Sequence, residues 1–119
     1  MTDIQKTAVS LHRSGFSCKR SVLRAAGKSI GLTEREAEGL GNPTPKEDIG
    51  KCGAVIAGLR ILEKKYGEQD ADTRKAAFEA AFREKNRSLL CRELRGKNGR
   101  SCTDYVSDAA EILDKMIAD

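Results

Sequence analysis

Apolar residues recur at the spacing of an α-helix along most of the chain, and this periodicity limits its fold more than any other feature. The clearest case runs from about Lys51 to Tyr66, where one stripe collects Cys52, Val55, Ile56, Leu59, Leu62 and Tyr66. No segment alternates apolar and polar residues as a half-buried strand would. The pattern therefore predicts an all-α protein.

The composition of the core agrees with packed helices. The chain has only three Phe, two Tyr and no Trp, so Leu, Ile, Val and Ala must fill the interior, which is less typical of a β-sandwich. Apolar residues make up 39% and charged residues 34% of the 119 residues. This suits one modest core with a charged exterior, so we expect a single domain over residues 1–119.

Capping residues and helix breakers divide the pattern into a helical bundle of four main helices plus short helices. The expected segments are residues 3–14, 17–29, 33–38, 51–66, 70–87, 88–94 and 102–118. Thr33 and Glu36 form a capping box, and Gly67 ends the helix at 51–66. Residues 39–51 contain three glycines and both prolines, and they predict the one long loop.

Each of the four cysteines falls at or near the start of a predicted helix: Cys18, Cys52, Cys91 and Cys102. The free N–H groups and the positive dipole end of a helix stabilise a thiolate. A thiol placed there has a lowered pKa and becomes a better nucleophile or metal ligand. If the helix starts meet at one end of the bundle, four activated thiols converge. Small residues at 53, 54, 57 and 58 would let another backbone approach the helix that follows Cys52.

The same residues leave other functions open. Three of the cysteines lie on apolar stripes, where free cysteine often packs as a small hydrophobic residue. No C-x-x-C pair and none of the usual iron–sulfur spacings is present. A non-enzymatic binding or regulatory module, with structural or redox-sensing cysteines, is the alternative to a redox site. An enzyme with a cysteine nucleophile would need a base, and the single histidine, His12, is remote in sequence from every cysteine.

Charge and hydropathy restrict location and partners. The net charge is +4, but acids interleave with the Lys and Arg residues, which is typical of a solvated surface rather than of nucleic-acid binding. No apolar run could span a membrane, and the N-terminal residues do not resemble a signal peptide. We expect a cytoplasmic protein, whose cysteines are not structural disulfides. It would act with an unidentified redox partner, and a homodimer is left open.

Four stretches in this order resemble a known family: FSCKRSVL around Cys18, CGAVIAG at 52–58, SLLCREL at 88–94 and SCTDYVSDAAEIL at 101–113. They are similar to the redox-active bacterial family named after its cysteine pattern, C_GCAxxG_C_C, which carries a Cys-Gly-Ala-x-x-Gly motif at the second cysteine. The resemblance runs from about His12 to Ile117. One departure is Ala57, which occupies the position of the motif's closing glycine.

The resemblance implies an α-helical domain whose site residues are Cys18, Cys52, Cys91 and Cys102. They would act as redox thiols that cycle between dithiol and disulfide, or as ligands of an iron–sulfur cluster or another metal. A related domain occurs in split-Soret cytochromes, although the sequence for covalent haem attachment is absent here. We expect either free thiols or a Cys91–Cys102 disulfide, because that pair is closest in sequence.

Overall fold

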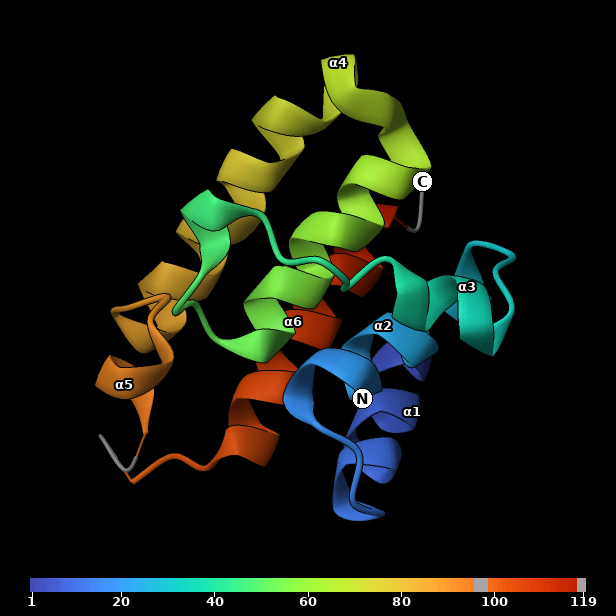
Figure 1. Ribbon diagram of the computed structural model, residues 1–119. Coiled ribbons are helices and arrows are strands. Elements are labelled where there is room, and N and C mark those ends of the chain that lie inside the picture. The colour runs from blue at the N-terminus through green and yellow to red at the C-terminus, as the bar shows by residue number, and fades with distance from the viewer. Residues whose placement is uncertain (96–98, 118–119) are drawn as a thin grey trace.

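The elements described by the computed structural model, which covers residues 1–95 and 99–117, are helices (Figure 1). They are α1 (Asp3–Arg13), α2 (Cys18–Ser29), α3 (Glu34–Gly39), the 3-10 turn η1 (Lys46–Asp48), α4 (Gly53–Asn86), α5 (Cys91–Leu94) and α6 (Cys102–Ile117). The predicted all-α class is confirmed. The last residue of the helix predicted at 102–118 lies outside the described residues.

The core lies where α1, α2, α4 and α6 pack against one another, with α6 in contact with the other three. The largest fully buried side chains come from α2, both halves of α4, and α6: Val22, Leu23, Val55, Ile61, Leu62, Phe78, Phe82, Val106 and Leu113. Apart from the two Phe residues, these are aliphatic side chains, as the scarcity of aromatics predicts.

The long helix α4 bends sharply at Gly67 and forms the V at the top of Figure 1. Gly67 has φ 80° and ψ 163°, a conformation that a residue with a Cβ rarely adopts. The sequence correctly places a break at Gly67, but the second arm follows without a linker. The two arms touch directly, because a Cβ added at Gly58 would lie only 2.3 Å from the Phe78 ring.

Local capping follows the sequence in most places. Thr33 Oγ1 accepts a hydrogen bond from the Glu36 N–H at 3.1 Å, and the Glu36 carboxylate accepts one from the Thr33 N–H at 2.9 Å. The Ser17 hydroxyl caps α2 by accepting from the Arg20 N–H at 3.1 Å. These pairs confirm the predicted starts of α2 and α3.

The start of α5 differs from the prediction. The helix expected at 88–94 begins at Cys91, because backbone hydrogen bonds pair residues 89 and 91 with residues 52 and 50. Lys51 and Leu90 form an isolated antiparallel bridge. Backbone hydrogen bonds to a distant segment therefore outweigh the capping potential of Ser88, whose hydroxyl accepts from the Leu90 N–H instead.

Candidate functional site: four thiols at helix starts

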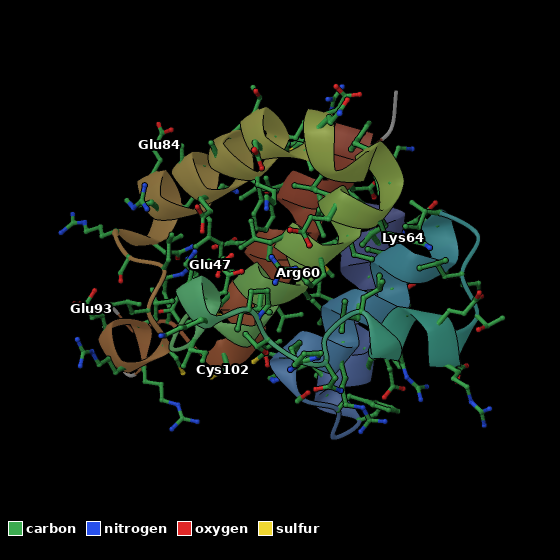
Figure 2. The ribbon with its side chains drawn as sticks, turned by 45° about the horizontal axis from the view of Figure 1, so that its top comes forward. Glu47, Arg60, Lys64, Glu84, Glu93 and Cys102 are labelled. Carbon is green, nitrogen blue, oxygen red and sulfur yellow. The ribbon has the colours of Figure 1, made fainter. Side chains whose placement is uncertain are left out.

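All four cysteines lie at helix starts, as the sequence predicts. Cys18, Cys91 and Cys102 are the first residues of α2, α5 and α6, and Cys52 is the N-cap of α4. Cys52 is 5% exposed, whereas the other three are half-buried. In Figure 2, Cys102 lies between α5 and the α1–α2 pair, so α6 begins among the other elements that carry cysteines.

An isolated antiparallel bridge between Lys51 and Leu90 brings the second and third cysteines near each other. The Cys52 N–H donates to the Leu89 carbonyl at 2.7 Å, and the Cys91 N–H donates to the Gly50 carbonyl at 3.0 Å. These two hydrogen bonds flank the isolated bridge between Lys51 and Leu90, so Cys52 and Cys91 each lie next to it.

A close contact between two helix starts joins the first cysteine to the second. A Cβ added at Gly53 would lie 3.0 Å from the Lys19 nitrogen and 3.3 Å from the Cys18 Cβ. The glycine that follows Cys52 therefore leaves the space that α2 needs to begin beside α4. The backbone approach expected from the small residues is present at Gly53, against α2, whereas Gly58 instead makes room for the Phe78 ring of the same helix.

The first and fourth cysteines are also adjacent. Both line a cavity of about 480 Å³ together with His12. The Ser101 hydroxyl accepts from the Asp104 N–H at 3.2 Å, which caps the start of α6 beside Cys102. The four helix starts thus bring the thiols into one region.

His12 is the site residue that the sequence did not indicate. Its Nε2 lies 3.6 Å from the Cys18 Sγ, and its Nδ1 lies 2.8 Å from the Thr103 hydroxyl oxygen. The expectation that His12 is remote from the cysteines is therefore wrong. The available signal was the short connection at residues 14–17, which returns the start of α2 to the end of α1.

Burial and mutual repulsion control the titration of the thiols. Burial raises the pKa of Cys18 to about 12, and the negative charges of Cys52, Cys102 and Cys91 act in the same direction. Burial also raises the pKa of Cys52, although the N–H groups of Ala54 and Val55 at the start of α4 act against it. The predicted lowering by helix starts is therefore overcome at both residues, which hold their protons at neutral pH.

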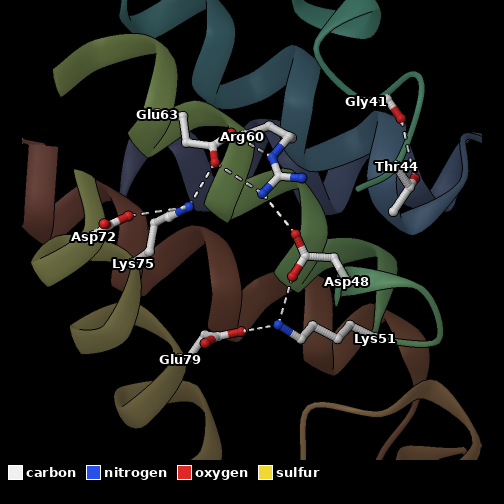
Figure 3. A network of polar contacts seen from close by, with 9 residues as sticks. All are labelled: Gly41, Thr44, Asp48, Lys51, Arg60, Glu63, Asp72, Lys75 and Glu79. Carbon is white, nitrogen blue, oxygen red and sulfur yellow. Dashed lines mark hydrogen bonds and ion pairs between the residues drawn. The ribbon is translucent and has the colours of Figure 1, made fainter. Parts of the chain in front are cut away.

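An ion-pair network fixes the loop that precedes Cys52 (Figure 3). The buried Asp48 carboxylate contacts Lys51 Nζ at 2.7 Å and Arg60 Nη2 at 2.8 Å. Lys51 also reaches Glu79 at 2.6 Å, on the second arm of α4. The network ties the residue before Cys52 to both arms of the bent helix.

The donor set can be compared with what a metal would need. Thiolates suit zinc and iron–sulfur clusters chemically. Within residues 1–95 and 99–117, however, no three His, Cys, Asp or Glu side chains are grouped so that they could hold a metal ion. The four cysteines are free thiols. The donors thus fit by chemistry but not by arrangement.

Comparison with known proteins identifies one family. The model of the family described as "Putative redox-active protein (C_GCAxxG_C_C)" matches residues 16–116, which include all four cysteines. No curated protein and no solved structure matches the chain significantly. Among the described residues, none of the helices has the length and apolar character required to cross a membrane.

Proposed function

The chain belongs to the C_GCAxxG_C_C family, and on that premise we propose that it is a thiol redox protein whose working couple is Cys18 and Cys102. The supporting observation is that these two half-buried thiols line the same cavity, which neither Cys52 nor Cys91 lines. Two thiols that line one small cavity can form a disulfide if their side chains turn toward each other. Ionisation of Cys52 or Cys91 would oppose ionisation of Cys18.

The reaction is a thiol–disulfide exchange in two steps. Cys102, at the start of α6, attacks one sulfur of a substrate disulfide as the thiolate. The substrate S–S bond breaks, and the first thiolate leaves and takes a proton from water. Cys18 then attacks the Cys102 sulfur of the mixed disulfide and releases the second thiol. The substrate gains two electrons, and the protein dithiol becomes the Cys18–Cys102 disulfide.

The surroundings of Cys18 suit a resolving thiol. Its raised pKa keeps Cys18 protonated while Cys102 reacts. Once Cys102 is in the mixed disulfide, its negative charge no longer opposes ionisation of Cys18, whereas burial, the largest cause of the raised pKa, remains. His12 Nε2, 3.6 Å from the Cys18 sulfur, is then placed to accept the proton. The Thr103 hydroxyl orients the imidazole by contacting its other nitrogen.

Disulfide mapping after mild oxidation tests this couple. We expect mass spectrometry to find a Cys18–Cys102 link in the wild type, and to find no such link in Cys18→Ser or Cys102→Ser. Cys91→Ser is the matched control, because it also removes a half-buried thiol at a helix start but should leave the link intact. A dominant link between any other two cysteines would contradict the proposal.

Ligation of an iron–sulfur cluster or another metal by all four thiolates is the alternative, and it has a distinct signature. Protein purified without oxygen would then be coloured or contain metal, and all four thiols would resist alkylation until the metal is removed. Colourless, metal-free protein in which Cys102 alkylates readily is the result expected for the dithiol couple.

A further inference from the structure

The charged side chains that line the cavities around the thiols are cationic. The cavity that contains Cys18 and Cys102 is also lined by His12, Lys19 and Arg95. A second cavity of about 590 Å³ contains Cys91 and is lined by Arg92 and Arg95. No described Asp or Glu lines either cavity. Acids are common elsewhere in this chain, with 18 in the sequence, so both approaches to the thiols are selectively cationic.

Arg95 connects the two cavities, because it lines both of them. Arg92 and Arg95 are exposed, and neither forms an ion pair with a described carboxylate. By contrast, Arg20, Arg24 and Arg60 are held by carboxylates of the protein itself. The two guanidinium groups near the thiols are therefore available to an anion from solution.

We propose that the substrate is a low-molecular-weight disulfide that carries carboxylates, an inference that rests on the thiol couple proposed above. Arginine binds carboxylates through two parallel hydrogen bonds, which gives both affinity and orientation. The two cavity volumes, about 480 and 590 Å³, lie in the range of small-molecule sites. Ile49, which is 68% exposed, supplies an apolar wall in the second cavity.

Recognition and chemistry meet at Arg95. A carboxylate bound to Arg95 places the rest of the ligand in the cavity that Cys102 lines. Cys102 attacks the ligand's disulfide, one carboxylated thiol leaves, and Cys18 displaces the second thiol as described above. The positive charges around the cavities also attract an anion from a distance. Salt weakens this attraction, so the association rate should decrease as ionic strength increases.

Two chromogenic disulfides of similar size separate recognition from reactivity. Dithiobisnitrobenzoate carries a carboxylate on each ring, whereas dithiodipyridine is neutral at the pH of the assay. We expect the reduced protein to react faster with the first, relative to a free thiol standard, and this preference to decline as salt increases. Arg95→Gln should reduce the rate with the anionic reagent about fivefold to tenfold and leave the rate with the neutral reagent unchanged.

Arg35→Gln is the matched control, because Arg35 is exposed on α3, across the molecule from α5 in Figure 1. Arg35→Gln removes the same charge as Arg95→Gln. If both substitutions reduce the rate with the anionic reagent equally, the cause is net charge rather than Arg95, and the inference is overturned. Equal reactivity with both reagents in the wild type would also overturn it while leaving the thiol couple intact. Failure of both reagents to modify Cys102 would overturn the couple and the inference together.

Discussion

At the scale of single residues, the surroundings of Cys18 matter more than its position in a helix. Cys18 is the first residue of α2, where a thiolate would be stabilised by free N–H groups. Three other cysteines approach it from separate elements, and burial removes the water that would solvate its charge. The same convergence that creates the site therefore keeps this thiol protonated.

This protonation predicts a loss of stability at high pH. The pKa of Cys18 is raised from an ordinary value near 9 to about 12. The unfolded chain therefore releases this proton first, and the stabilisation, complete below about pH 9, declines as pH rises toward 12. Under reducing conditions, the free energy of unfolding should fall over this window. The fall should be smaller in Cys18→Ala, and an identical pH dependence in the two proteins would contradict the assignment.

At the scale of elements, the close approach of the starts of α2 and α4 requires a residue without a side chain at position 53. Gly53 is the position where a Cβ would press on the Lys19 nitrogen at 3.0 Å and the Cys18 Cβ at 3.3 Å. Backbone atoms at a helix start have little freedom to move. The contact therefore sets how closely Cys18 and Cys52 approach.

Gly53→Ala should separate these two helix starts. We expect it to lower the free energy of unfolding by about 1–3 kcal/mol, as overpacking of a tight contact does, and to weaken formation of the Cys18–Cys102 disulfide. Chemical denaturation and thiol mapping measure the two effects. Gly39→Ala is the control, because a Cβ at Gly39 in α3 meets nothing within 4 Å; a similar loss in both variants would contradict the role of the contact.

At the scale of the whole molecule, buried charge holds the loop and the bent helix in one arrangement. Burial alone would raise the pKa of Asp48, but hydrogen bonds and charges from Lys51 and Arg60 outweigh it, so the pKa is lowered. Arg60 is itself buried and depends on Asp48 and Glu63 for compensation. Removal of the Asp48 charge would leave a cation without its closest buried partner.

Asp48→Asn should therefore lower the free energy of unfolding by about 3 kcal/mol, the scale for breaking a buried pair. It should also loosen the segment that carries Lys51 and Cys52, which faster amide exchange of the Cys52 N–H would report. Glu47→Gln is the matched control, because Glu47 is exposed and forms no ion pair with a described residue (Figure 2). Equal stability of Asp48→Asn and the wild type would show that the network does not anchor the loop.

The sequence by itself determined the features that depend on neighbours along the chain. Helical periodicity gave the all-α class, and capping pairs such as Thr33 with Glu36 located helix starts, because these interactions span only three or four residues. Gly67 was recognisable as a break because only glycine readily adopts its backbone conformation. The cysteines could be placed at helix starts for the same local reasons.

The tertiary structure alone decided how those local pieces meet. The cavity that Cys18 and Cys102 share and the approach of His12 depend on how α1, α2 and α6 pack. The later start of α5 depends on backbone hydrogen bonds to residues 50–52. The pKa values of the buried thiols are raised rather than lowered as the sequence predicted, because burial and charge repulsion depend on distances in space. Sequence spacing does not encode those distances, so the site's chemistry becomes visible only once the helix starts are brought together.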